Sequence, residues 1–144
     1  MLIFLVRTDM MTEELFYAGY NKIDKKRKQK TDKKKFYRDK CNCVAAGLLL
    51  NYAVKIYCED KKCCERISKE KYEKKYISDM LSYVDINKLI TFYDPAYDYN
   101  IIAGDNGKPY FVHIGQDNIY FNLTHSGDYA ACVIGDKENG IDIE

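Results

Sequence analysis

A histidine and two carboxylates in the last quarter of the chain have the types and spacing that best suit chemistry. Thr124 and His125 stand in the run F-N-L-T-H-S, and Asp142 and Glu144 alternate with isoleucines in the run G-I-D-I-E. In a strand, residues two apart project from one face, with about 6 to 7 Å between their Cα atoms. Mg²⁺ commonly takes one or two carboxylates and completes its shell with water and phosphate oxygens. The pattern therefore predicts a magnesium site that handles a phosphate-bearing substrate.

Each of these residues also has a structural explanation. A histidine after a strand can be a loop residue bonded to backbone, and carboxylates on an edge strand discourage pairing with other chains. Lys108, between a glycine turn and Pro109, can be only an exposed turn residue. On the residues alone, both explanations stay open.

The composition indicates one ordinary domain in a cytoplasmic protein. A chain of 144 residues can bury a sizeable core, and its net charge of +1 gives no overall attraction to nucleic acid or to an anionic membrane. No apolar run approaches the roughly 20 residues that span a bilayer, and the apolar start is too short for a signal peptide. We expect the six cysteines to be reduced packing residues rather than disulfides or zinc ligands.

Residues 22–40 form a strongly basic segment, with eleven lysines and arginines against three aspartates. A solvated helix face explains such a run in most proteins. Nucleic-acid binding is a second explanation, although aromatic residues that stack on bases are nearly absent between the lysines. A compact polyphosphate ligand or an acidic partner protein fits as well.

The hydrophobic pattern predicts an α+β fold, with an antiparallel sheet packed on a long helix. We expect a strand at 2–6, a short helix at 13–20 after the N-cap Thr12, and a core helix at 39–57, in which Gly47 permits close packing. Residues 61–76 are charged, and 77–89 have a weaker amphipathic pattern. A period of two then predicts strands at 90–93, 110–114, 119–123, 129–134 and around Ile141 and Ile143. We expect a turn at 104–107, between the first two of these strands.

Three segments, G-K-P at 107–109, F-N-L-T-H-S at 121–126 and the final G-I-D-I-E, occur in this order behind a basic segment and an A-A-G-L-L-L helix. Together they resemble the 4′-phosphopantetheinyl transferases of the surfactin-synthetase-activating type. The resemblance is strong over 108–144, moderate over 25–57 and absent over about 58–90, where we expect an insertion in the single domain 1–144.

The resemblance implies one half of a pseudo-twofold α+β fold, and transfer of the phosphopantetheine arm of coenzyme A to a serine of an acyl or peptidyl carrier protein. It implies that Asp142 and Glu144 hold Mg²⁺ and that His125 donates to a phosphate, these three being the catalytic set. It also implies coenzyme contacts from Thr124, Lys108, Arg27 and Lys30. Such a site suits phosphoryl transfer, which depends mostly on positioning and charge neutralisation.

Two departures from the family stand out. Asn42 and Cys43 replace an arginine and a serine or threonine at the start of the long helix, which predicts weaker coenzyme affinity. A second half with a W-x-x-K-E motif, supplying a third acidic group and a lysine for proton transfer, is not in this sequence. We therefore expect an amino-terminal half that is inactive alone, and whose exposed apolar face promotes self-association.

Two other functions stay open. The chain can be a non-catalytic module that binds coenzyme A or another nucleotide. Less favoured is a nucleic-acid-binding protein that uses the basic segment, which predicts a steep dependence of affinity on salt.

Overall fold

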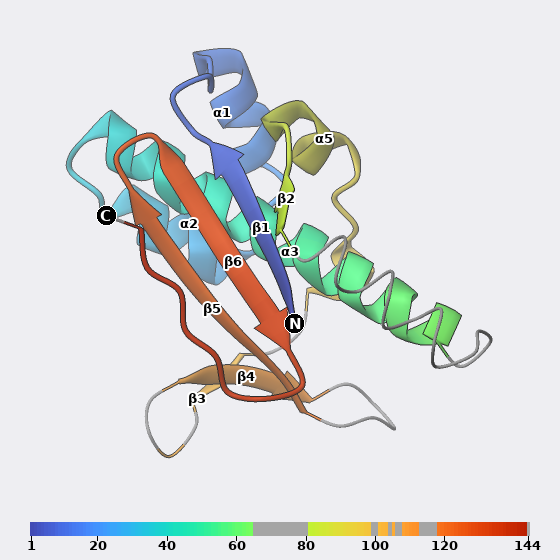
Figure 1. Ribbon diagram of the computed structural model, residues 1–144. Coiled ribbons are helices and arrows are strands. Elements are labelled where there is room, and N and C mark those ends of the chain that lie inside the picture. The colour runs from blue at the N-terminus through green and yellow to red at the C-terminus, as the bar shows by residue number, and fades with distance from the viewer. Residues whose placement is uncertain (65–80, 99–100, 104, 106–107, 113–117, 144) are drawn as a thin grey trace.

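The computed structural model describes residues 1–64, 81–98, 101–103, 105, 108–112 and 118–143, and in it a mixed sheet packs on a long helix (Figure 1). Helices α2 and α3 lie behind the sheet in this view, so the fold is a mixed α+β fold. The elements, in chain order, are β1 (Leu2–Arg7), α1 (Glu13–Tyr20), α2 (Lys25–Asp32), α3 (Tyr37–Cys64), β2 (Leu81–Tyr83), α5 (Ile86–Thr91), the short 3-10 helix η1 (Pro95–Tyr97), β3 (Ile102–Ala103), β4 (Pro109–Val112), β5 (Asn118–Ser126) and β6 (Tyr129–Gly135).

The six strands lie in the order β2-β1-β6-β5-β4-β3. All neighbours are antiparallel except β1 and β2, which run parallel. The expected antiparallel sheet is therefore correct for five strands and wrong for β2, which the sequence pattern did not indicate. Strand β6 lies between β1 and β5, in agreement with its continuous apolar run.

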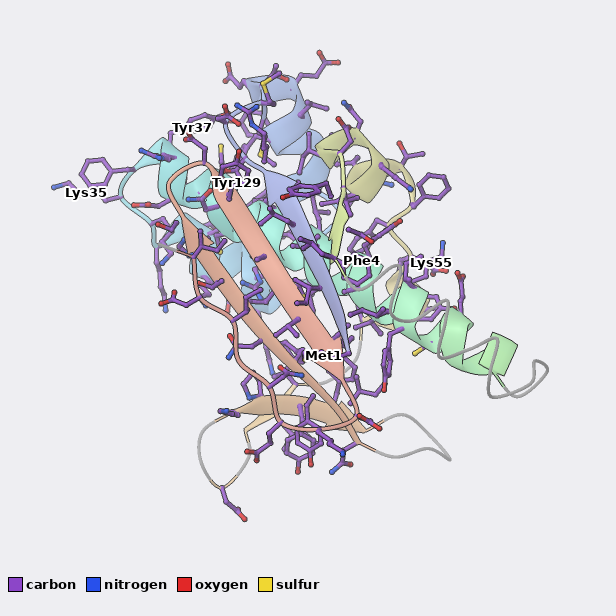
Figure 2. The ribbon with its side chains drawn as sticks, viewed as in Figure 1. Met1, Phe4, Lys35, Tyr37, Lys55 and Tyr129 are labelled. Carbon is purple, nitrogen blue, oxygen red and sulfur yellow. The ribbon has the colours of Figure 1, made fainter. Side chains whose placement is uncertain are left out.

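Helix α3 forms the core of the fold. Its buried residues include Val44, Leu48 and Leu49, and the inward residues of β6, such as Cys132 and Ile134, face it across the core. The ring of Phe4, labelled in Figure 2, meets the Tyr52 ring edge-on with 5.7 Å between centroids. Burial of each large apolar side chain contributes about 1.5 to 3 kcal/mol. The helix runs from Tyr37 to Cys64 and is therefore longer at both ends than the expected 39–57.

The two short helices begin at side-chain caps. Thr12 accepts a hydrogen bond from the backbone N of Leu15 and begins α1 at the expected residue, and Asp24 accepts one from the backbone N of Arg27 and begins α2. Helix α2 packs closely on α3: a Cβ added at Gly47 would lie 3.0 Å from Cγ of Arg27. The expected role of Gly47 in close packing is confirmed.

Two expected strands are absent from the described structure. Residues 90–93 were expected to be a strand, but the chain forms helix α5, because Asp85 caps it and Ile86 and Leu89 bury one face at helical spacing. The segment 138–143 has no regular structure, since the Asp142 carboxylate accepts the backbone N–H of Ile143 that a strand would use. Most of the expected turn at 104–107 lies outside the described residues. The whole of segment 65–76 also lies outside them.

Over Tyr37–Glu59, α3 is long and apolar enough to cross a membrane by length and composition alone. Of its most apolar window, 78% is buried inside the fold, which is also what a core helix shows.

At the edge formed by β1 and β2, the face of the sheet opposite α3 carries apolar side chains. Ile3 and Leu5 project from it and pair with Leu81 and Tyr83 of β2, whose exposed fractions are 54% and 74%. No helix covers this face of β1 and β6 in Figure 1. Leu81 and Tyr83 are the most exposed apolar residues of this edge.

Candidate functional site

His125 lies within β5, one residue before the strand ends, rather than in a turn after it. Along β5, Phe121 is buried in the core on the α3 side, and alternation places His125 on that same side. The site therefore begins on the helix-covered face of the sheet.

Helix α2 lies behind the sheet with α3, on the side that His125 faces (Figure 1). Partial desolvation lowers the pKa of His125, and the positive charges of Lys34, Lys30 and Arg27 lower it further, against an opposing effect of Asp39. Positive charges act on an imidazole in this way only when they lie near it. The basic segment therefore acts electrostatically on His125, almost a hundred residues away in sequence, and we call Arg27, Lys30, Lys34 and His125 together the α2–His125 site.

A pocket of about 420 Å³ extends the α2–His125 site along α2. Arg27 and Lys30 line this pocket and also act on His125. Its other lining residues come from the start of α2 and from the segment that leads to β3: Asp24, Lys25, Lys26, Asp98 and Ile101. We call it the α2 pocket, and its concentration of cations suits a phosphate-bearing ligand.

Lys108 is exposed and stands directly before β4. Strand β4 begins at Pro109, which pairs with Ala103 of β3, and β3 begins one residue after Ile101 of the α2 pocket. Lys108 is therefore joined to β4, and the partner of β4, strand β3, begins directly after the pocket residue Ile101.

Thr124 and Asp142 come together on the other side of β5. Thr124 Oγ1 lies 3.5 Å from Asp142 Oδ1, the length of a weak hydrogen bond, and Asp142 is exposed. Since Thr124 and His125 are neighbours in a strand, their side chains project to opposite faces. Asp142 thus reaches the predicted motif through Thr124, while Glu144 lies outside the described residues.

The described residues contain no group of three or more histidine, cysteine, aspartate or glutamate side chains that could hold a metal ion. Magnesium needs only one or two protein carboxylates when substrate phosphate and water fill the other positions. The exposed carboxylate of Asp142, oriented by Ile143 N at 3.0 Å, fits one such position.

Two residues at the start of α3 hold the turn that follows His125, a role that the sequence analysis missed. Arg38 Nε and Asn42 Nδ2 donate to the carbonyl of Gly127 at 3.2 and 3.3 Å, and Arg38 Nη2 pairs with Asp128 at 3.0 Å. Tyr37 and Tyr129, which mark the starts of α3 and β6, lie at the same end of the molecule in Figure 2. The backbone φ of Gly127 is 56°, a conformation that favours glycine, so the glycine at this position was the sequence signal for the turn.

Asn42 was noted in the sequence for replacing a residue that touches the nucleotide in the family. In the structure it is 3% exposed, and its Oδ1 has no hydrogen-bond partner among the described residues. Its amide therefore anchors the Gly127 turn instead of facing the α2 pocket.

Comparison with protein-family models gives no match, and comparison with curated proteins gives none either.

Proposed function

We propose that this chain is the coenzyme-binding half of a 4′-phosphopantetheinyl transferase, which moves the phosphopantetheine arm of coenzyme A to a serine of an acyl or peptidyl carrier protein. The observation that supports the proposal is the α2–His125 site. Two separate motifs of the resemblance contribute to it: the basic segment supplies cations, and the F-N-L-T-H-S run supplies the His125 imidazole, whose pKa these cations lower.

In the proposed reaction, the serine oxygen forms a bond to the β-phosphorus of coenzyme A, and the bond from that phosphorus to the bridging oxygen breaks. Adenosine 3′,5′-bisphosphate leaves. Arg27, Lys30 and Lys108 balance phosphate charge, and Thr124 adds a hydroxyl contact. His125, neutral in the absence of ligand because its pKa is lowered, donates one N–H to a phosphate oxygen.

Magnesium would supply charge neutralisation on the diphosphate when bound, with Asp142 as one ligand and Glu144 as a second. A second candidate is a module that binds coenzyme A without catalysis, because Asp142 and the cations of the α2 pocket lie on opposite sides of β5. This separation also leads us to expect little transfer by the chain alone.

Calorimetry with coenzyme A tests the proposal. We expect binding that weakens at least tenfold when Arg27 and Lys30 are both changed to Gln, because charge-assisted hydrogen bonds to phosphate contribute about 1.5 to 3 kcal/mol each. The double variant Lys55→Gln and Lys88→Gln, which removes two cations outside the α2 pocket, serves as control. Failure of the wild-type chain to bind coenzyme A would contradict the proposal.

The metal separates the two candidates. If the chain is part of a transferase, Mg²⁺ should tighten coenzyme A binding, and Asp142→Ala should remove that effect. Affinity that is independent of Mg²⁺ would favour the non-catalytic module. An assay with coenzyme A, Mg²⁺ and an apo carrier protein measures transfer directly, and rapid modification of the carrier would refute the expected inactivity of the isolated chain.

A further inference from the structure

The carboxylate of Asp98, in the wall of the α2 pocket, is held at both oxygens. Asn51 Nδ2 donates to Oδ1 at 2.8 Å, and the hydroxyl of Tyr93 donates to Oδ2. Asn51 belongs to the core helix α3 and is 3% exposed, whereas Asp98 is exposed. A carboxylate that reaches solvent thus has a position fixed from the core.

Loop anchoring alone does not require this carboxylate. Asn51 also donates to the carbonyl of Asp94 at 2.8 Å and accepts the backbone N–H of Asp94 at 3.1 Å, so its amide already joins the segment before η1 to α3. The carboxylate of Asp98 adds negative charge to a pocket that four cations line, and negative charge opposes phosphate binding. Its presence there is useful when the ligand also carries a hydrogen-bond donor.

The acceptor capacity of Asp98 allows such a contact. An ionised carboxylate has about four lone-pair positions, and Asn51 and Tyr93 occupy two of them. The pocket volume, about 420 Å³, lies in the range of small-molecule sites. Phosphates at Arg27 and Lys30 would leave the adjoining nucleoside within the same pocket.

We propose that Asp98 is a specificity-determining residue, whose carboxylate accepts a hydrogen bond from the nucleoside end of the ligand while Arg27 and Lys30 hold its phosphates. The inference rests on the proposed function, because coenzyme A supplies the nucleoside. The donor is an exocyclic amine of the base or a hydroxyl of the ribose. Asn51 and Tyr93 are the positioning residues.

Binding of three bisphosphates tests the inference: adenosine 3′,5′-bisphosphate, its inosine analogue without the amine, and its 2′-deoxy analogue without the hydroxyl. The wild-type chain should bind one of the two analogues about tenfold or more weakly than the adenosine compound, because a hydrogen bond to a charged group is lost. The weaker analogue identifies the donor. Equal affinity for all three would overturn the inference.

Asp98→Asn should erase this discrimination. The same variant should bind inorganic pyrophosphate as well as the wild-type chain or more tightly, since a negative charge leaves the pocket. A merely structural role predicts instead that every ligand weakens together, and that result would overturn the inference. Asp136→Asn, which removes a carboxylate outside the pocket, should change neither measurement.

Tyr93→Phe provides a second variant that keeps the carboxylate. It should reduce the discrimination without improving pyrophosphate binding, and unchanged discrimination would show that Tyr93 does not position Asp98. If coenzyme A does not bind the wild-type chain at all, the proposed function and this inference fail together. If coenzyme A binds and Asp98→Asn discriminates as the wild type does, the inference alone fails.

Discussion

Thr124 and His125 are adjacent in β5, yet they serve opposite faces of the sheet. Thr124 lies 3.5 Å from the Asp142 carboxylate, and the pKa of His125 is lowered by the charges of Lys34, Lys30 and Arg27 in the basic segment. A ligand that engages both must therefore reach around the end of β5, where the turn at Gly127 is held by Arg38 and Asn42.

The first prediction concerns the protonation of His125. In the folded chain its pKa should lie below the ordinary imidazole value of 6.5, because desolvation and nearby positive charges disfavour the imidazolium. Lys34→Gln should raise it, and a bound phosphate should raise it too. Titration of the imidazole resonances by NMR measures this, with His125→Asn to assign them, and a pKa at or above 6.5 would contradict the structure.

The same shift fixes the sign of a pH effect on stability. Because the pKa of His125 is lower in the folded state, the unfolded state binds more protons than the folded state at pH values near and below 6.5. The contribution of His125 to the free energy of unfolding is therefore intact above about pH 6.5 and is lost as the pH falls toward the folded pKa. In His125→Asn this part of the pH dependence should disappear.

The second prediction concerns the packing of α1 on α3. A Cβ at Gly19 would lie 2.9 Å from Leu48 and 3.0 Å from Val44, both fully buried. Gly19→Ala should lower the free energy of unfolding by about 1 to 2 kcal/mol, since overpacking outweighs the gain in helix propensity. Gly140→Ala, with no atom within 4 Å of the new Cβ, is the control for urea unfolding and should be neutral. Equal stability of the two variants would refute the close approach.

The third prediction concerns the buried amide of Asn51. Asn51→Ala leaves the backbone N–H and carbonyl of Asp94 without their partner, which should cost about 2 to 3 kcal/mol of unfolding free energy. Asn87→Ala, at an exposed position of α5, should stay within about 0.5 kcal/mol of the wild type. Thermal and urea unfolding measure both, and a neutral Asn51→Ala would show that water replaces the amide.

The fourth prediction concerns the open face of the sheet. Apolar side chains around Tyr83 and Leu81 should make the chain associate at high concentration through an isologous contact. Tyr83→Lys should weaken the association measured by sedimentation, and Phe36→Lys, an exposed aromatic on the turn between α2 and α3, should not. A monomer at every concentration would contradict this prediction.

Local signals predicted the elements that depend on local physics. Helix α1 begins at the expected Thr12 because a side-chain cap involves only three neighbouring residues, and β6 was predicted because a central strand is apolar on both faces. The strand predicted at residues 90–93 was wrong, because the prediction gave more weight to β-branched residues than to the helix cap at Asp85. Strand β2 was missed because three residues are too few to show an alternating pattern.

The site was only partly accessible from the sequence. Its residue types suggested phosphate chemistry, and the resemblance implied that Arg27, Lys30 and His125 act together, but no periodic pattern can place α2 on the side of the sheet that His125 faces. Asp98 carries no motif, because its environment depends on Asn51, far away in the chain. Asp142 and Glu144 were expected on one face of a strand. The hydrogen bond from the backbone N–H of Ile143 to the Asp142 carboxylate is a local side-chain interaction that alternation does not predict.

The pairing of β1 with β6 joins residues more than a hundred positions apart. During synthesis on the ribosome, the apolar residues Leu2 to Val6 emerge more than a hundred residues before β6 and have no antiparallel partner until β6 leaves the exit tunnel. Chaperones that shield newly made apolar segments therefore have the most time to act on β1, and completion of the sheet is a late event governed by the slow closure of a long loop.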